Sequence, residues 1–420
     1  MFKINRFPTS DEYKALCERP TMDTSSLGNV IQDIFEQVKS KKDEAVKDFT
    51  LRFEKRSIDS INYTQSEINT LAKQTDPLLQ QAIKQAYSNI KKFHEAQIIS
   101  EKRIETMPGV VCWQKSTAIE KVGIYIPGGT APLFSTILML AIPAQIAGCS
   151  DIILCTPGTH PALFFTAQLC GITHMSKIGG AQAIAALALG TESIPQVYKI
   201  FGPGNQYVTA AKMYANQNGI AIDMPAGPSE VAVYADETAN PIFVASDLLS
   251  QAEHGSDSQV ILVSNNEALI QQTIHEVNRQ VENLPRKEFA IQSLANSKFI
   301  LVANQKEAVT FLNQYAAEHL ILACEQSEEM AYQIKNAGSI FLGNYTPEAA
   351  GDYASGTNHT LPTNGFARVY SGVNLDSFCK KITLQSISKE GLENLSTSIV
   401  TMAEAESLQG HANAIKFRMN

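Results

Sequence analysis

The sequence of 420 residues is 44% hydrophobic and 18% charged, and its formal net charge is −8. These values are typical of a globular chain with two or more domains, and they exclude a disordered chain. The negative charge argues against a broad nucleic-acid-binding surface, which needs clustered Lys and Arg. We therefore expect no nucleic-acid partner.

The N-terminal residues and the cysteines indicate the cellular compartment of the protein. The opening MFKINRFPTSDEY lacks the apolar core of a secretory signal. The longest apolar stretch, residues 131–147, is broken by polar residues and prolines, so no segment approaches the roughly 18 apolar residues of a membrane-spanning helix. The seven cysteines form no CxxC pair, and their odd number is typical of reduced thiols. We expect a cytoplasmic protein without a membrane partner.

Residues 1–119 are expected to form a largely helical region. Apolar residues between positions 26 and 50 recur with a period close to 3.6, and residues 68–94 continue the pattern. This region has no glycine-rich loop. We interpret it as a scaffold that forms part of the second α/β domain.

Residues 120–228 alternate between predicted strands and helices. Strands are predicted at 122–125, 151–155 and 197–201, with a further strand that ends at Ile178. The predicted helices lie at about 133–147, 161–171, 181–189 and 206–216. Glycines follow the strand ends, as in β-α units that build a mostly parallel sheet. Ligands bind such sheets at the carboxyl ends of the strands, where these glycine loops lie.

Residues 229–365 are predicted to form a second α/β block. Its strands are expected at 229–235, 259–264, 299–302 and 339–342. Its helices are expected at about 240–254, 268–282, 306–317 and 325–337. A loop rich in Gly, Thr and Asn follows at 351–365. Residues 366–420 are interpreted as a C-terminal segment with a helix at 392–406 and a tail at 407–420.

The turn Gly202-Pro-Gly204 lies between a strand and a helix, where a phosphate-binding loop belongs. It is not the dinucleotide fingerprint, because Tyr207 stands where the third glycine should be. Nucleotide binding and an ordinary tight turn both remain open from these residues.

Gln251 and His254 lie three residues apart at the end of a predicted helix, on one face. An amide oxygen and an imidazole could be half of a metal site. The alternative is a polar last turn that stops at Gly255, and spacing alone favours it. Other candidate ligands at the ends of elements are His359, His411 and Asp352. Two His, one Asp and one amide oxygen would suit Zn²⁺.

Glu318 and His319 place a carboxylate beside an imidazole at the end of a predicted helix. Adjacent helical residues diverge by roughly 100°, so each would reach a substrate separately. Imidazole is the usual general base near neutral pH, and a carboxylate can activate water. The alternative is a histidine stabilised by the helix dipole, which these two residues alone favour.

The chain as a whole resembles the histidinol dehydrogenase family, whose members catalyse the last two oxidations of histidine biosynthesis. The resemblance covers essentially the whole chain and rests on these motifs, in this order: VGIYIPGGTAPLFSTILMLAIPAQIAG, GGAQAIAALALGTE, FGPGNQYVTAAK, IDMPAGPSE, SQAEHG, AAEHL, NHTLPTNG and QGHANA. It implies an α/β fold like that of aldehyde dehydrogenases. Two Rossmann-like parallel-sheet domains without the standard fingerprint would be joined to small N- and C-terminal helical segments.

The resemblance also implies a set of site residues. The metal ligands of the family fall on Gln251, His254, Asp352 and His411, and its catalytic bases fall on Glu318 and His319. Its cofactor-binding residues fall on Tyr125, Gln182 and Asn205. Its substrate-binding residues fall on Ser229, Gln251, His254, His319, Asp352, His359, Glu406 and His411, with Ser135 as a further candidate.

The family's chemistry implies one Zn²⁺ per subunit, NAD as cofactor and L-histidinol as substrate. It also implies a homodimer, because Glu406 and His411 serve the neighbouring subunit's site in the family. Residues 120–228 would bind NAD, 229–365 would carry the metal and catalytic residues, and 366–420 would reach the partner. The alternatives are a related dehydrogenase acting on another amino alcohol or polyol, a zinc hydrolase without nucleotide, and a silent binding protein.

Overall fold

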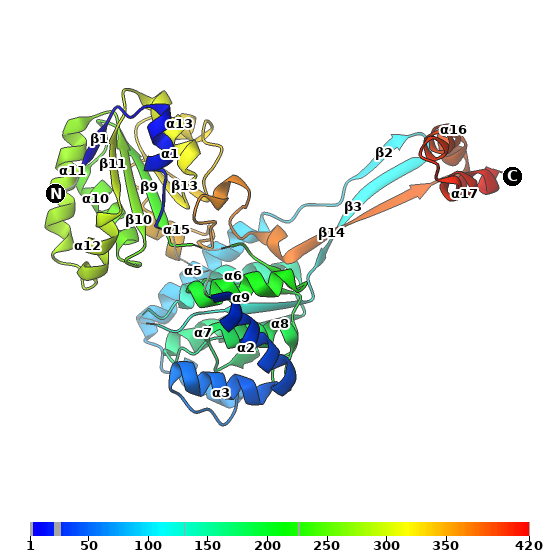
Figure 1. Ribbon diagram of the computed structural model, residues 1–420, viewed down its shortest axis with the longest axis horizontal. Coiled ribbons are helices and arrows are strands. Elements are labelled where there is room, and N and C mark those ends of the chain that lie inside the picture. Colours follow the sequence, from blue (N-terminus) through cyan, green and yellow to red (C-terminus); the bar gives the residue numbers. More distant parts are fainter. Residues whose placement is uncertain (1–2, 21–26, 130, 226, 420) are drawn as a thin grey trace.

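The computed structural model describes residues 3–20, 27–129, 131–225 and 227–419. Two lobes, each built on a sheet, lie against one another, and a long projection extends from them to the C-terminus (Figure 1). We call the two lobes the body and residues 103–118 and 379–419 the arm. No helix within these described ranges is both long and apolar enough to cross a membrane.

The first lobe contains a five-stranded parallel sheet in the order β6-β5-β4-β7-β8. Its strands are β4 (Lys121–Tyr125), β5 (Asp151–Cys155), β6 (His174–Ser176), β7 (Lys199–Phe201) and β8 (Ala221–Ile222). The helices between them are α6 (Phe134–Ala147), α7 (Pro161–Leu169), α8 (Gly180–Leu189) and α9 (Gln206–Gln217). The β-α units predicted from the sequence are confirmed here, since helices on both faces bury a parallel sheet.

The N-terminal helices correct our interpretation of residues 1–119. We expected this region in the second domain, but its helices pack on the first lobe. These helices are α2 (Leu27–Lys41), α3 (Asp43–Glu54), α4 (Gln65–Ala72) and α5 (Pro77–Glu95). The strand β1 (Ile4–Arg6) and the helix α1 (Ser10–Leu16) join the second lobe instead. An apolar stripe predicts that a helix face is buried, but it does not identify the surface that covers it.

The second lobe contains a six-stranded parallel sheet in the order β1-β11-β10-β9-β12-β13. Its further strands are β9 (Glu230–Ala235), β10 (Gln259–Ser264), β11 (Lys298–Leu301), β12 (His319–Ala323) and β13 (Ser339–Leu342). Its helices are α10 (Pro241–Ala252), α11 (Glu267–Val281), α12 (Lys287–Ala295), α13 (Gln305–Tyr315), α14 (Ser327–Ala331) and α15 (Glu348–Tyr353). The two parallel sheets confirm the predicted α/β class.

Strand β12 corrects our placement of residues 316–320 at a helix end. Helix α13 ends at Tyr315, and Ala316 adopts a left-handed conformation with φ of 55°. The chain then enters β12 at His319 and pairs with β9 and β13. All five residues of β12 are buried. Tertiary pairing therefore overrides a helical pattern here, and it places Glu318 and His319 at the start of a strand.

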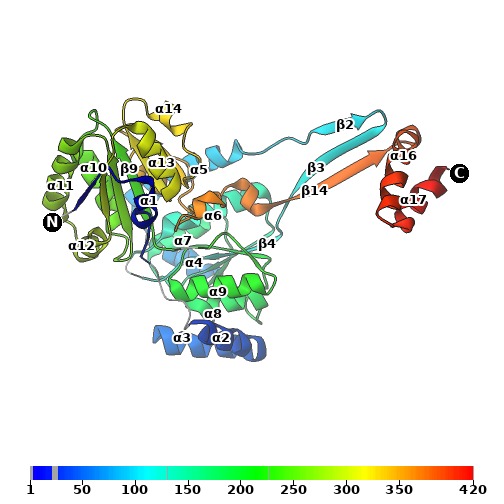
Figure 2. The same cartoon turned by 45° about the horizontal axis from the view of Figure 1, so that its top comes forward.

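The strands of the arm were not predicted from the sequence. The arm is a three-stranded antiparallel sheet of β2 (Arg103–Met107), β3 (Val110–Ala118) and β14 (Cys379–Ile387), which leads to α16 (Lys389–Ala405) and α17 (Gln409–Met419). The helix expected at 392–406 is confirmed as α16, whereas the tail expected at 407–420 is wrong, because α17 lies there. Figures 1 and 2 both show the arm extending away from the body. Most residues of β2 and β14 are exposed, so the apolar alternation of a half-buried strand is weak. Two 3₁₀ turns, η1 (Phe366–Arg368) and η2 (Leu375–Phe378), precede β14.

Candidate active site and metal centre

A cavity of about 270 Å³ lies between the two lobes. The second lobe contributes Ser229, His254, Glu318, His319, Asp352 and His359 to its wall. The first lobe contributes Ser135 and Thr136 of α6, the turn Gly202–Gly204, and Lys212 of α9. The structure therefore brings most of the expected site residues of the second lobe together at one interface between lobes.

The Glu318–His319 pair is held in place by the neighbouring strand β9. The backbone N–H of Glu230 donates to Oε2 of Glu318 at 2.9 Å, and the backbone oxygen of Glu230 lies 3.3 Å from Nδ1 of His319. Glu318 is 5% exposed and His319 is 3% exposed, so little water competes for either group. Their side chains approach to 3.7 Å between Oε2 and Nδ1. This distance is longer than a hydrogen bond, so separate access of the two groups to a substrate stays a prediction.

The surroundings shift the pKa of both groups upward. Burial raises the pKa of Glu318 to about 7, because a desolvated carboxylate is costly. Burial alone would lower the pKa of His319, but the nearby carboxylates of Glu348, Glu318 and Asp352 outweigh it and raise the pKa to about 10. Two buried carboxylates and the partly buried Asp352 therefore surround one imidazole and favour its protonated form.

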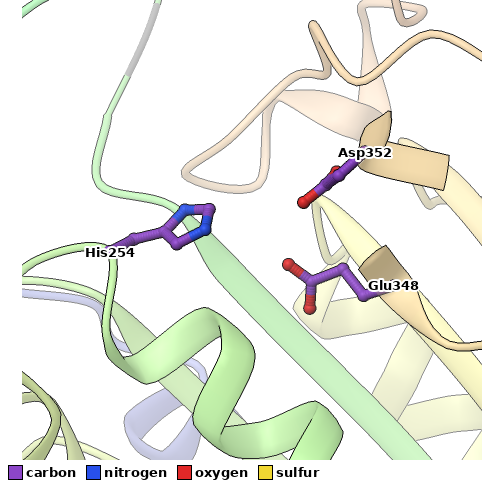
Figure 3. Close-up of side chains that lie close together, drawn as sticks. All are labelled: His254, Glu348 and Asp352. Atoms are coloured by element: carbon purple, nitrogen blue, oxygen red, sulfur yellow. The ribbon is translucent and has the colours of Figure 1, made fainter. Parts of the chain in front are cut away.

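A candidate metal centre adjoins the pair. One nitrogen of His254 and one oxygen each of Glu348 and Asp352 all lie within 4.8 Å of one another. His254 follows the end of α10, whereas Glu348 and Asp352 lie four residues apart on α15 and so share a face. Figure 3 shows the three side chains pointing toward a common space. Asp352 also lies 3.4 Å from Nε2 of His319.

Two buried polar side chains near this cluster lack hydrogen bonds, although Oε1 of Glu348 lies 3.8 Å from Nδ1 of His319. Both amide atoms of Gln251 and both carboxylate oxygens of Glu348 are without a hydrogen bond among the described residues. Gln251 is 0% exposed and Glu348 is 1% exposed. Unpaired buried polar groups are costly, and burial raises the pKa of Glu348 to about 8. One imidazole nitrogen and several oxygen donors fit a divalent cation such as Zn²⁺.

His359 joins the two lobes beside this centre. Its Nδ1 lies 2.7 Å from the backbone oxygen of Asp352, and its Nε2 lies 3.0 Å from Oγ1 of Thr136 on α6. Burial lowers the pKa of His359, which favours the neutral ring. With Nδ1–H donating to Asp352, Nε2 is left to accept from Thr136. His359 is therefore a neutral ring that forms one hydrogen bond to each lobe at the cavity wall.

The expected cofactor-binding residues lie on the first lobe and occupy two places. The hydroxyl of Tyr125 accepts from the N–H of Gly180, and Gln182 is 1% exposed beneath the same turn. Asn205 caps α9 by accepting from the N–H groups of Tyr207 and Val208. Asn205 also lines a second cavity of about 450 Å³, which shares Gly204, Gly227, Ser229 and His254 with the first.

The turn beside Asn205 is fixed by a buried ion pair that the sequence reasoning did not identify. Lys212 donates to the backbone oxygen of Gly202 at 2.9 Å, and Asp223 accepts from the N–H of Gly202 at 2.8 Å. Lys212 and Asp223 also pair with each other. Gly202 has a φ of 123°, and a Cβ there would lie 2.0 Å from the backbone oxygen of Tyr125. Only glycine fits this close approach.

Two expected site residues lie elsewhere. Glu406 follows α16 and His411 lies in α17, both exposed at the far end of the arm (Figure 1). Neither lines the cavity of this chain. The set implied by the resemblance is therefore divided between body and arm.

Glu348 is a site residue that the sequence reasoning missed. Its signal was available, because Glu348 and Asp352 form an i, i+4 carboxylate pair directly before a Gly-rich loop. That spacing is common on exposed helices, and only the fold shows that this pair is turned inward. No cysteine lines the cavity, and burial raises the pKa of Cys149 to about 12, so a thiolate nucleophile finds no support here.

Comparisons with known proteins agree along the whole chain. The family model described as histidinol dehydrogenase matches residues 17–419. Histidinol dehydrogenase from Bacteroides thetaiotaomicron is 53% identical, with 100% of this chain and 99% of the relative covered. The chloroplastic histidinol dehydrogenase of Arabidopsis thaliana is 49% identical, covering 98% of this chain and 90% of the relative. A crystal structure of histidinol dehydrogenase from Elizabethkingia anophelis is 52% identical and aligns with a TM-score of 0.98, covering 100% of this chain and 98% of that one.

Proposed function

This chain belongs to the histidinol dehydrogenase family, and on this basis we propose that it oxidises L-histidinol to L-histidine in the last steps of histidine biosynthesis. The reaction passes through L-histidinaldehyde and removes four electrons, with two molecules of NAD⁺ each accepting a hydride. The observation that carries the proposal is the buried Glu318–His319 pair, which shares a cavity with His254 and Asp352.

In the first oxidation, His319 accepts the proton of the substrate hydroxyl. The O–H bond breaks toward the imidazole as the hydride leaves the carbinol carbon, so an aldehyde forms. His319 suits this role because it is buried in the cavity wall and bonded at Nδ1 to the neighbouring strand. A rigid base within reach of the hydroxyl lowers the barrier without reorganisation.

In the second oxidation, Glu318 accepts a proton from a water molecule that adds to the aldehyde carbon. The pKa of about 7 makes this carboxylate a stronger base than an exposed Glu near neutral pH. His319, protonated in the first oxidation, returns that proton to the carbonyl oxygen as the water adds. It then takes a proton from the hydrate as the second hydride leaves. Retention of the reactive aldehyde in a cavity between lobes limits side reactions.

For the metal, we propose Gln251, His254 and Asp352 as ligands from this chain, with Glu348 as an additional carboxylate. The support is the cluster geometry and the side-chain atoms of Gln251 and Glu348 that have no hydrogen bond among the described residues. When bound, Zn²⁺ would hold the substrate's nitrogen atoms and offset the carboxylate charge that raises the pKa of His319. His411 would complete the set from a partner subunit.

NAD⁺ would bind along the carboxyl ends of the first lobe's strands. Tyr125, Gln182 and Asn205 lie beside the turns that follow β4, β6 and β7. Helices α8 and α9 begin at two of these turns, and a helix N-terminus after a strand end suits a pyrophosphate. We also propose a homodimer in which Glu406 and His411 of each arm enter the partner's cavity, because both are exposed on the arm and neither lines its own cavity.

The proposed function is tested by the stoichiometry of the reaction. Purified zinc-loaded protein with NAD⁺ and L-histidinol should form two NADH for each histidinol consumed, measured by absorbance and by amino-acid analysis for histidine. A single NADH per histidinol would limit the activity to the alcohol step. Absence of NADH formation would refute histidinol as substrate and favour another amino alcohol or polyol.

The metal proposal has a readout apart from activity. Glu348→Gln should weaken Zn²⁺ affinity by roughly 10- to 100-fold, measured by competition with a chromogenic chelator. Glu276→Gln is the matched control, because Glu276 lies on the outer helix α11 and pairs with Arg279. Equal affinity in both variants would remove Glu348 from the metal site.

A further inference from the structure

Glu230 contacts both members of the Glu318–His319 pair through three of its own groups. Its backbone N–H donates to Oε2 of Glu318 at 2.9 Å, and its backbone oxygen lies 3.3 Å from Nδ1 of His319. Its side-chain oxygen Oε1 accepts from the backbone N–H of Glu318 at 3.3 Å. Glu230 is 1% exposed, so these bonds do not compete with bulk water.

Arg19 holds the Glu230 carboxylate from the other side. Its Nη2 donates to Oε1 of Glu230 at 2.8 Å, and its Nε pairs with Oε2. The Arg19 side chain is 9% exposed and that of Glu230 is 2% exposed. A bidentate, buried arginine–carboxylate pair fixes direction as well as charge. The segment after α1 is thereby connected to the first residue of β9.

The same arginine also anchors the turn that precedes Glu318. Nη2 of Arg19 donates to the backbone oxygen of Tyr315 at 2.6 Å, and the guanidinium lies 4.1 Å from the centre of the Tyr315 ring. Between Tyr315 and Glu318 the chain passes through Ala316, whose left-handed φ of 55° is unfavourable for a residue with a Cβ. Arg19 fixes the start of this turn directly and its end through Glu230.

We propose that Arg19 and Glu230 are a positioning pair that sets the orientation of Glu318 and His319. The inference rests on the proposed function for the roles of Glu318 and His319. Neither Arg19 nor Glu230 lines the cavity, so their effect passes through the two residues that do. The Glu230 carbonyl takes the Nδ1–H of His319, which leaves Nε2, the nitrogen 3.4 Å from Asp352, to accept the substrate proton.

The test uses an apolar replacement of the whole pair. Loss of one partner would leave a buried charge unpaired and could unfold the chain, so the double variant Arg19→Met/Glu230→Leu is preferred. It should keep a cooperative thermal transition but lower kcat for both histidinol and histidinaldehyde by about 100-fold, the cost of a displacement of about 1 Å. KM for histidinol should change little. The single variant Arg19→Lys keeps a cation opposite Glu230 but cannot form the bidentate contact. Its kcat should lie between those of the wild type and the double variant.

The matched control is Arg6→Met. Arg6 also pairs with a glutamate of the second lobe, Glu267, but that pair is exposed and lies at the edge strand β1. This variant should keep wild-type kcat. A folded double variant with wild-type kcat for both substrates would overturn the proposal.

A crystal structure of the double variant separates this inference from the proposed function. In the expected result, Glu318 and His319 lose their contacts with the start of β9 and occupy altered positions. Unchanged positions of both side chains would overturn the positioning role, whatever the substrate. If the wild-type protein oxidises no histidinol, the proposed function fails, but this structural result still decides whether Arg19 and Glu230 position the pair.

Discussion

The body and the arm place the same residue types in opposite surroundings. In the body, Glu318 and His319 are nearly inaccessible, bonded to strand β9 and surrounded by carboxylates. In the arm, Glu406 and His411 are exposed, and no hydrogen bond of their side chains is found within the described parts of the chain. A glutamate and a histidine are thus buried and hydrogen-bonded only where the fold supplies neighbours.

The contrast between body and arm shows which part of the candidate site a single chain can form. The body of one chain brings together the Glu318–His319 pair, the acidic cluster and Gln251, whose amide has no hydrogen bond among the described residues. The arm projects its two residues into solvent at the end of an exposed antiparallel sheet. An exposed residue contributes to a buried site only if a second surface covers it, which is the physical content of the proposed homodimer.

Loss of the His319 imidazole is expected to have the largest effect on the rate of oxidation. His319→Asn should lower the rate of both oxidations by about 10³- to 10⁴-fold, because each step loses its proton acceptor. The measurement is single-turnover NADH formation from histidinol and, separately, from histidinaldehyde. A variant that retains either step at the wild-type rate would show that another group in the cavity is the base for that step.

A second substitution divides the two steps. Glu318→Gln should leave alcohol oxidation near the wild-type rate and slow aldehyde oxidation by roughly 10²- to 10³-fold, because only the second step activates water. The measurement is again single-turnover NADH formation from histidinol and from histidinaldehyde. Equal losses in both steps would contradict the separate roles of Glu318 and His319 and would make Glu318 a residue that mainly orients the imidazole.

Mixing of two inactive variants tests whether the body of one subunit and the arm of its partner form one site. His319→Ala and His411→Ala subunits should each be inactive alone. After unfolding, mixing and refolding, random pairing should restore roughly a quarter of wild-type activity, because half of the dimers then hold one intact site out of two. Heterodimers that form, as shown by two distinct affinity tags, but remain inactive would contradict a shared site.

The last prediction concerns the pH dependence of aldehyde oxidation. Burial raises the pKa of Glu318 to about 7, and a general base acts only when deprotonated. The rate of aldehyde oxidation should therefore fall about tenfold for each pH unit below about pH 7. Glu406→Gln in the arm should lower activity without moving this midpoint. A rate that stays level to about pH 5 would show that Glu318 does not titrate as the water-activating base.

Much of the fold could be predicted from local sequence patterns. The strands of β4, β5, β9 and β10 follow apolar runs of the right length, and glycines mark turns such as the one at Gly202. The Glu318–His319 pair was found as a pair, but its position at a strand was not, since residues 306–317 continue a helical pattern almost to that point. The arm strands escaped prediction because few of their residues are buried.

The sequence by itself determined the β-α units and the residue types able to perform proton transfer and bind a metal, because periodicity and turn residues act within a few positions. The tertiary structure decided which of those residues meet. It placed Glu230 against Glu318, 88 residues away, and turned Glu348 toward His254. It also placed His411, on α17 of the arm, outside the cavity of its own chain. Contacts across such separations depend on strand order and lobe packing, which no local pattern encodes.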